Sequence, residues 1–342
     1  MATPAEDFGK NGAAPNAQRG VWASAAGQVL EAQNRWLDRL SDPEWGAVGP
    51  RLRDAWRAAG GRETLDMAEY LAGYGGYVDR VGPRRAAIFR NTITYGPAAL
   101  EQPEILFACR AHEIVHGLQA HASAARHAMV FGRDVPVLLC PQDYILLAER
   151  MEEDAYAKQT WLCALAAQDS PRLDKVNDGR LHAFKANRAA FGLTEALKIA
   201  ARAAMAVPVA AGGERKSRRE VYRQEWLSEY RKFLAYIRRS EKAVFVRLTA
   251  ADVKDVGESF GPNPFTGPSG TVDPAFFGLA DLTPDERRQI DELNALAGIG
   301  DDTALPTLGQ ALKNFGLDRQ GFLTRSRGEN APSAPPPRRP AP

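Results

Sequence analysis

His112 and His116 stand four residues apart around Glu113, in the string His112-Glu113-Ile114-Val115-His116. On an α-helix, positions four apart lie on the same face, so both imidazoles can reach one tetrahedral zinc ion. Glu113 is rotated by about 100° from His112, which keeps its carboxylate off the metal and beside a water that it could deprotonate. Histidine is scarce, with five in 342 residues. The spacing therefore predicts a metal site with a general base next to it.

A catalytic zinc site usually takes three protein ligands and keeps one position for water. His121 is the nearest further candidate, five residues after His116. In the extended three-histidine motif a Gly turns the chain so that the last histidine can return to the metal, and here Gln119 stands in that place. We therefore expect His121 to point elsewhere. Gln119 itself falls on the side of the histidines, where it could orient a ligand or make only a polar contact.

An acid-rich stretch downstream offers three better candidates, because Glu149, Glu152 and Glu153 fall at i, i+3 and i+4. Glu152 lies in the middle of an uncharged stripe, whereas Glu153 lies on its flank. An acid on such a stripe is costly to bury unless it is paired or bound to metal. We predict Glu152 as the third ligand and Glu149 as the alternative. A salt-bridged acidic helix face is the competing interpretation for each of the three. The stripe consists of Ile145, Ala148, Tyr156 and Cys163.

Three elements are expected to position these residues. The run from Ala86 to Tyr95 is rich in β-branched and aromatic residues and predicts a strand. Pro103 suits the first turn of a helix that should reach about residue 126, which places both histidines in its middle. Pro141 begins a second helix that should end before Ser170.

Composition excludes several classes of protein. Hydrophobic residues make up 44% and charged residues 25%, which is ordinary for a soluble globular protein. A net charge of +2 provides no general attraction to nucleic acid or membrane, so we expect neither partner. The N-terminus lacks a secretory pattern and no apolar stretch is long enough for a membrane span, which favours a cytoplasmic location. The three cysteines, Cys109, Cys140 and Cys163, form no C-x-x-C pair, and we expect reduced thiols.

The order of a strand, an H-E-x-x-H helix and a helix carrying Glu152-Glu153-Asp154-Ala155 resembles the gluzincin branch of the zincin metallopeptidases. More closely, the segment from His112 to Gln119 is similar to a bacterial metallopeptidase family with an H-E-x-x-H-x-x-Q core. The resemblance covers residues 80–165. It implies His112 and His116 as zinc ligands, Glu113 as general base and Glu152 as the third ligand. The chain departs from well-studied gluzincins in the long spacing between His116 and Glu152 and in lacking an N-E-x-x-x-D string.

The expected fold class is α+β and predominantly α-helical, with a zincin-like active-site helix preceded by a β-strand and extra helices at both ends. Residues 1–20 and 326–342 are rich in Ala, Gly or Pro without apolar periodicity and should be disordered. Residues 21–207 would form the metallopeptidase domain, with two N-terminal helices expected from the apolar spacing between Trp22 and Ala59. A breaker-rich linker at 208–213 would lead to a helical C-terminal region at 214–325, in which Thr283-Pro284-Asp285-Glu286 should start a short helix with Thr283 as its cap.

These observations predict a zinc-dependent metallopeptidase that hydrolyses a peptide or protein substrate, with Zn²⁺ as cofactor and Glu113 as general base. Tyr156, Tyr222, Tyr230 and His182 are the candidates for stabilising the oxyanion. The alternative is a non-catalytic helical interaction protein with a vestigial or structural zinc site. An exported toxin-type protease is disfavoured by the missing secretory pattern.

Overall fold

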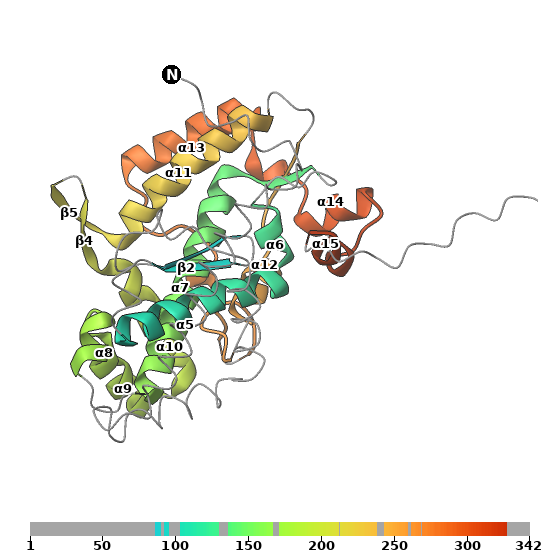
Figure 1. Cartoon of the computed structure of the whole chain (residues 1–342). Helices are drawn as coiled ribbons and strands as arrows, with labels where there is room; N and C mark the ends of the chain where they lie inside the picture. The colour runs from blue at the N-terminus through green and yellow to red at the C-terminus, as the bar shows by residue number, and fades with distance from the viewer. Residues whose placement is uncertain are drawn as a thin grey trace, which may run out of the picture. The chain divides into compact units, whose positions relative to one another are not determined.

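The computed structural model describes residues 86–89, 92–95, 103–129, 136–166, 171–211, 213–237, 243–258, 261–267 and 269–326. The chain divides into two compact units, Met1–Arg110 and Ala111–Pro342. Helices predominate among the described residues and strands are few, so the prediction of a mainly helical α+β fold is confirmed (Figure 1). The helices expected between Trp22 and Ala59, and the two ends expected to be disordered, lie outside the described residues except for Ser326.

The described helices and strands follow one another along the chain with these bounds. The helices are α5 (Pro103–Ala122), α6 (Ala124–His127), α7 (Pro141–Ala166), α8 (Pro171–Val176), α9 (Arg180–Phe191), α10 (Leu193–Ala206), α11 (Arg218–Ile237), α12 (Ala250–Gly257), α13 (Pro284–Ala297), α14 (Leu308–Asn314) and α15 (Arg319–Ser326). The strands are β1 (Ala86–Phe89), β2 (Thr92–Tyr95), β3 (Val137–Leu139), β4 (Pro208–Ala211), β5 (Glu214–Ser217) and β6 (Val244–Val246).

The described strands of the first unit form an antiparallel pair, β1 with β2, in which Ile88 lies opposite Ile93. The sequence predicted one continuous strand from Ala86 to Tyr95, and this was wrong. The two halves of the run pair with each other, so that each segment satisfies backbone hydrogen bonds of the other.

The first site-bearing helix, α5, begins at Pro103, as the sequence predicted. It ends at Ala122, and α6 continues beyond Ser123 rather than forming one helix to residue 126. Ser123 has an extended backbone, with φ −105° and ψ 113°. Serine is a weak helix former because its hydroxyl competes for backbone hydrogen bonds. The two histidines stand in the middle of α5, well before this break.

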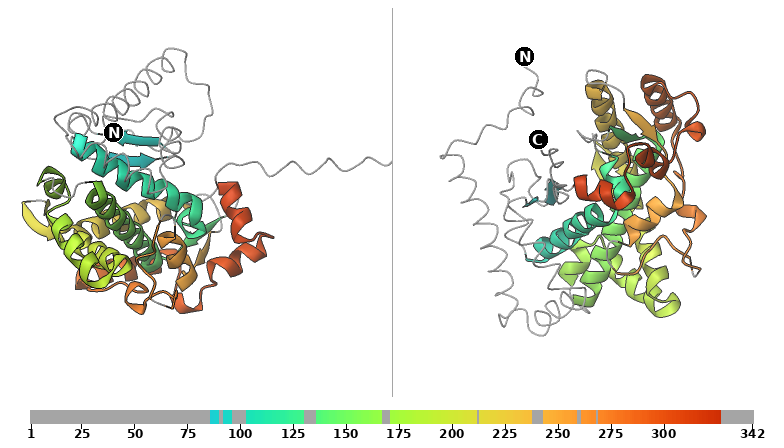
Figure 2. Two further views of the ribbon diagram at one scale, coloured as in Figure 1. Left: turned by 90° about the horizontal axis from the view of Figure 1, so that it is seen from below. Right: turned by 90° about the vertical axis from the view of Figure 1, so that its right-hand side faces the viewer.

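The second site-bearing helix, α7, is the central helix of the second unit. It runs from Pro141 to Ala166 and packs against α9, α10, α11, α12 and α13. Helices α8, α9 and α10 lie together in both views of Figure 2. Because α7 has neighbours on several sides, many of its polar side chains are buried as well as its apolar ones. Those polar groups need partners inside the protein.

A short parallel sheet anchors the start of α7. Strand β3 pairs with β6, with Leu138 opposite Phe245, and the Cys140 N–H donates to Val246 O at 2.9 Å. Asp143, in the first turn of α7, accepts a hydrogen bond of 2.7 Å from the Leu248 N–H. The sequence reasoning missed both strands, because each is three residues long and its partner lies about a hundred positions away.

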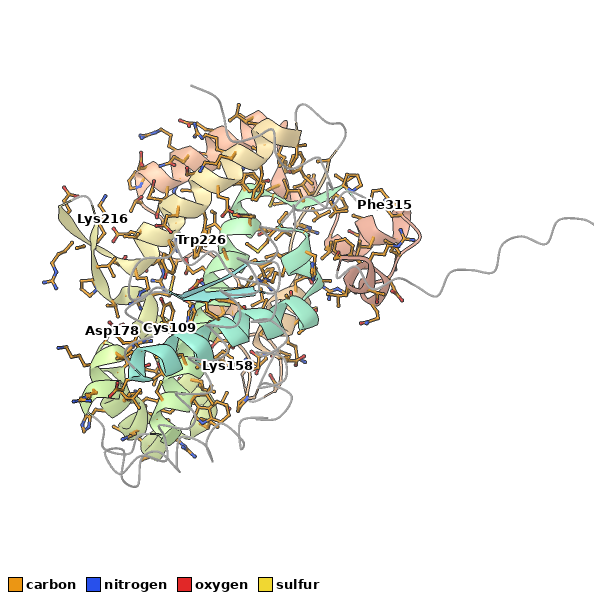
Figure 3. The ribbon with its side chains drawn as sticks, viewed as in Figure 1. Cys109, Lys158, Asp178, Lys216, Trp226 and Phe315 are labelled. Atoms are coloured by element: carbon orange, nitrogen blue, oxygen red, sulfur yellow. The ribbon has the colours of Figure 1, made fainter. Side chains whose placement is uncertain are left out.

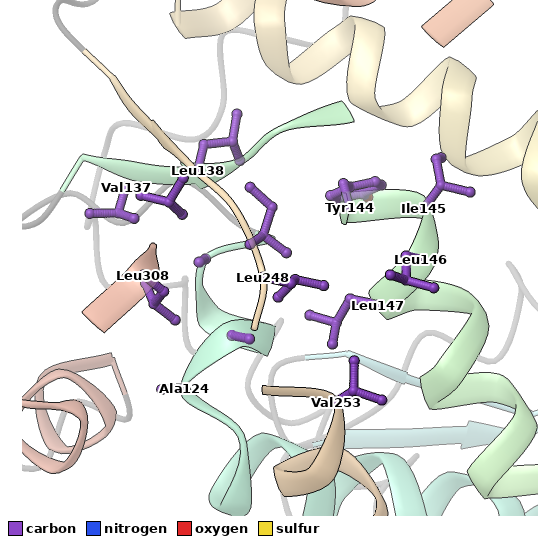
Figure 4. Packing of buried hydrophobic residues seen from close by; sticks show 14 of the residues in the cluster. Ala124, Val137, Leu138, Tyr144, Ile145, Leu146, Leu147, Leu248, Val253 and Leu308 are labelled. Carbon is purple, nitrogen blue, oxygen red and sulfur yellow. The ribbon is translucent and has the colours of Figure 1, made fainter. Parts of the chain in front are cut away.

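The hydrophobic core surrounds this sheet. Strand β3 is fully buried and contributes to a cluster with the first turns of α7 and with residues from α12, α14 and the segment after β6 (Figure 4). The labelled members include Val137, Leu147, Leu248, Val253 and Leu308. Each of these side chains has 4% or less of its surface exposed. Burial of apolar surface on this scale holds α7 in place and therefore fixes the side chains along it.

The expected linker at 208–213 belongs instead to a β-hairpin. Strand β4 pairs with β5, with Pro208 opposite Ser217. Gly213 has a φ of +86°, a backbone conformation that glycine adopts without strain. Both sides of the hairpin lie within the unit Ala111–Pro342. The predicted boundary between 207 and 214 therefore does not separate two compact units.

Helices α11 and α13 lie side by side (Figure 1). The start of α13 was predicted and is confirmed, because Thr283 Oγ1 accepts from the Glu286 N–H at 3.1 Å and Glu286 Oε2 accepts from the Thr283 N–H at 2.8 Å. This reciprocal pair is a capping box, which satisfies two backbone donors at the helix start. Within the part of the chain that the structure describes, no helix combines the length and the apolar character that a membrane span requires.

Candidate metal centre

Three side chains from α5 and α7 converge on one point. His112 Nε2 and His116 Nε2 lie 3.1 Å apart. Glu152 Oε2 lies 3.3 Å from His112 Nε2, and Glu152 Oε1 lies 3.2 Å from His116 Nε2. The structure thus brings Glu152, the predicted third ligand, to both histidines.

The donor atoms lie close enough together to share one ion. Two donors about 2.1 Å from a tetrahedral zinc ion are separated by about 3.4 Å. The two imidazole nitrogens lie 3.1 Å apart, each contacts a different oxygen of Glu152 at 3.2 or 3.3 Å, and one donor atom from each residue lies within 4.8 Å of the others. Two imidazole nitrogens and one carboxylate oxygen are also a common donor set of catalytic zinc. The residues present therefore fit a zinc ion, with His112, His116 and Glu152 as the group that could hold it.

The electrostatics of this group are those of a buried acid between two bases. Burial alone lowers the pKa of His116, but the charge and hydrogen bond of Glu152, with help from Glu113, raise it to about 9. Burial would raise the pKa of Glu152, yet the two imidazoles hold it well below its ordinary range. In the metal-free protein, a proton on His116 therefore occupies the position that a cation would take.

Gln119 contacts the ligand group, as the sequence suggested. Its Oε1 lies 2.9 Å from His116 Nδ1, the nitrogen that points away from Glu152. Its Nε2 donates to Met151 O on α7 at 3.0 Å. The side chain has 0% of its surface exposed. It therefore connects the histidine helix to the carboxylate helix.

The other two acids considered as ligands have arginine partners instead. Glu149 accepts hydrogen bonds of 2.8 Å from Arg150 and from Arg223, and it forms an ion pair with Arg219, whose Nε lies 3.0 Å away. Glu153 pairs with Arg150 and with Arg219. Both carboxylates are fully buried, and they bind α7 to α11. Their role in this structure is that of ion-pair partners, which is the competing interpretation raised for an acidic helix face.

The candidates for stabilising an oxyanion separate into two groups. The Tyr156 ring packs on His112, with 4.3 Å between ring centroids, and Tyr156 Oη lies 3.0 Å from Tyr222 Oη. Tyr230 donates to Leu139 O at 2.7 Å inside the hydrophobic core, and His182 is exposed on α9. Only the first two tyrosines therefore lie at the metal centre.

Both of these tyrosines keep their protons near neutral pH. Burial and the nearby charge of Glu152 raise the pKa of Tyr156 to about 12 and raise that of Tyr222 further. Arg218 lies over the Tyr156 ring, with 4.5 Å from its Cζ to the ring centroid. A protonated phenol can donate a hydrogen bond to a developing negative charge.

Glu113 and His121 complete the residues named from the sequence. Glu113 is buried, and its charge contributes to the raised pKa of His116, so it lies near the metal centre. Arg126 donates to His116 O at 2.7 Å and also interacts electrostatically with Glu113. The side chain of His121 is outside the described part of the structure.

Comparisons with known proteins provide no further identification. No protein-family model, no curated protein and no solved structure matches this chain.

Proposed function

We propose that this chain is a zinc-dependent hydrolase of peptide bonds, cytoplasmic in location, with His112, His116 and Glu152 as the metal ligands. The observation that supports this most is the convergence of their side chains: the two imidazole nitrogens lie 3.1 Å apart, and each lies 3.2 or 3.3 Å from one oxygen of the Glu152 carboxylate. Two of the ligands come from the H-E-x-x-H string that also carries an acid suited to general-base catalysis. The gluzincin resemblance of residues 80–165 agrees with this assignment.

The metal and the protein have separate tasks in the proposed reaction. When bound, zinc supplies a Lewis acid and lowers the pKa of a water molecule toward about 7. Glu113 would accept the proton of the attacking water and deliver it to the leaving amine. Tyr156 or Tyr222 would donate a hydrogen bond to the oxygen of the scissile carbonyl as its charge develops. Both are protonated at neutral pH, as this role requires.

The test compares the full-length chain with Glu113→Gln. Metal content is measured by mass spectrometry after dialysis, and cleavage is measured on a complex mixture of peptides because the substrate is unknown. We expect about one zinc per chain in both proteins. Cleavage should be confined to the wild type, since an amide cannot accept the proton. Glu195→Gln is the matched control, because this carboxylate is on α10, is 46% exposed and pairs with Lys198.

Each outcome decides between the proposal and its rival. A chain that binds no zinc overturns the proposal and favours the interaction protein with a vestigial site. A chain that binds zinc but cleaves no peptide favours a structural zinc site. Zinc binding with equal cleavage by wild type and Glu113→Gln removes Glu113 from its assigned role.

A further inference from the structure

A line of buried polar side chains leads from His116 through α7 to the end of α12. Gln119 Nε2 donates to Asp154 Oδ2 at 2.9 Å, and Asp154 Oδ1 lies 2.7 Å from Lys158 Nζ. Lys158 Nζ in turn donates to Gly257 O at 2.9 Å. Gln119, Asp154 and Lys158 each have 0% of their surface exposed, and Lys158 is labelled in Figure 3. The mechanism described above uses none of these three.

The contacts of Gln119 determine which way its amide points. Nε2 donates one hydrogen to Met151 O and the other to Asp154 Oδ2. A carbonyl and an ionised carboxylate only accept, so the amide oxygen cannot take the place of the nitrogen. Oε1 must therefore face the imidazole of His116, 2.9 Å away. Because an amide oxygen has no hydrogen to donate, His116 Nδ1 must carry one.

We propose that Gln119, Asp154 and Lys158 are positioning residues that hold His116 with Nδ1 protonated and with Nε2 turned to His112 and Glu152. A neutral imidazole binds metal only through its unprotonated nitrogen, so the opposite tautomer would direct an N–H at the cation. The inference rests on the proposed function in taking a metal as the group that Nε2 serves. It does not depend on which reaction the metal supports.

The cost of the buried charges is a reason to assign them a role. A buried ion pair is often no more stabilising than apolar side chains of similar volume. Asp154 stands where an acceptor is needed to orient Gln119, and Lys158 pairs with it. His112 offers a contrast, since its Nδ1 is buried and has no hydrogen-bond partner among the described residues. Of the two histidines at the candidate metal site, His116 is therefore the one whose Nδ1 has a partner.

The experiment uses the full-length chain with ¹⁵N-labelled histidine, in which five residues give signals. The wild type should show a slowly exchanging N–H on His116 Nδ1, and ¹¹³Cd should couple to Nε2 of the same ring. Gln119→Leu should abolish the slowly exchanging proton. It should also weaken zinc binding by about 10- to 100-fold, as expected for loss of a partner that orients a ligand.

A double variant tests the far part of the line. Asp154→Leu with Lys158→Met removes both charges together, so neither is left buried without its partner. Gln119 Nε2 then keeps only its hydrogen bond to Met151 O, so we expect faster exchange of the His116 Nδ1 proton and a smaller weakening of zinc binding than in Gln119→Leu. Gln159→Leu is the matched control, because it makes the same change at a buried amide of α7, with 6% exposed and its Oε1 unbonded among the described residues. Its zinc affinity and His116 signals should equal those of the wild type.

Thermal unfolding of every variant separates loss of stability from loss of positioning, since a purely structural role would lower stability without moving the proton on His116. Persistence of the protected Nδ1 proton in Gln119→Leu, or wild-type zinc affinity in both variants, overturns the proposal. If the wild type binds neither zinc nor cadmium, the proposed function fails. In that case the ¹⁵N signals of His116 in the metal-free protein above pH 9, where the ring is neutral, still show whether Nδ1 carries the proton and so decide the positioning role.

Discussion

Exchanging Glu149 and Glu152 separately for Gln should separate folding from metal binding. The two changes are chemically identical and lie one turn apart on α7. Glu149 is fully buried and pairs with three arginines at 2.8 to 3.0 Å. Two of these, Arg150 and Arg223, have 3% and 1% of their surface exposed. Glu152 contacts His112 and His116 instead.

The expected magnitudes follow from what each partner can do when its acid is lost. Guanidinium groups do not deprotonate in proteins. Glu149→Gln therefore leaves buried positive charge, and removing one partner of a buried pair costs about 3–5 kcal/mol. With about 2–4 °C per kcal/mol, the melting temperature should fall by roughly 10 °C. The imidazoles near Glu152 can lose their protons and become neutral. Above pH 9, where His116 is already neutral, Glu152→Gln should therefore cost roughly 1 kcal/mol, the value of a lost hydrogen bond.

For zinc affinity we expect the opposite order, with the larger loss in Glu152→Gln. Glu152→Gln removes a proposed ligand, so zinc affinity should fall by more than the roughly 10- to 100-fold typical of an outer partner. Glu149→Gln should bind zinc with wild-type affinity at a temperature where it is folded. Calorimetric unfolding and chelator competition at low temperature measure the two effects. Loss of zinc by folded Glu149→Gln, or wild-type affinity in Glu152→Gln, would refute the reasoning.

Three further predictions concern pH, the oxyanion and the end of α12. Because the pKa of His116 is raised from 6.5 to about 9, its contribution to the stability of the metal-free protein is complete below pH 6.5 and is lost as the pH rises through 9. Zinc must displace this proton. Isothermal titration in two buffers near pH 7.5 should therefore show proton release, and the affinity for zinc should fall with falling pH. Binding without proton uptake by the buffer contradicts this. One of the variants Tyr156→Phe and Tyr222→Phe, the one that removes the donor to the oxyanion, should lower kcat about 10²- to 10³-fold with zinc content unchanged. Wild-type kcat in both variants would exclude both phenols from this role. Gly257→Ala would place a Cβ against the side chain of Asn263, so it should lower the melting temperature, and an unchanged melting temperature would argue against this close approach.

The parts of the fold that the sequence predicted are those with local causes. The starts of α5, α7 and α13 were foreseen because Pro103, Pro141 and the Thr283 cap act on the residues next to them. Strands β3 and β6 were missed because a three-residue strand is stabilised mainly by its partner. The hairpin of β4 and β5 was mistaken for a linker because Pro and Gly mark both.

The candidate site shows the same division. The spacing of His112, Glu113 and His116 is visible in five consecutive residues. Asp154 and Lys158 have no local pattern that distinguishes them from other acidic and basic residues of a helix. Their position beside Gln119 depends on the packing of α5 against α7, and a prediction would have required knowledge of that packing.

By itself, the sequence determined that two imidazoles lie one turn apart with an acid beside them, because the helical period is a property of consecutive residues. It also restricted the candidates for a third ligand to a few carboxylates on one later helix. Only the tertiary structure distinguishes their surroundings, since it places arginines of α11 against Glu149 and Glu153 and both histidines against Glu152. The physical reason is that the nearest cation or proton determines the role of a buried carboxylate. Those neighbours come from segments far away in the chain.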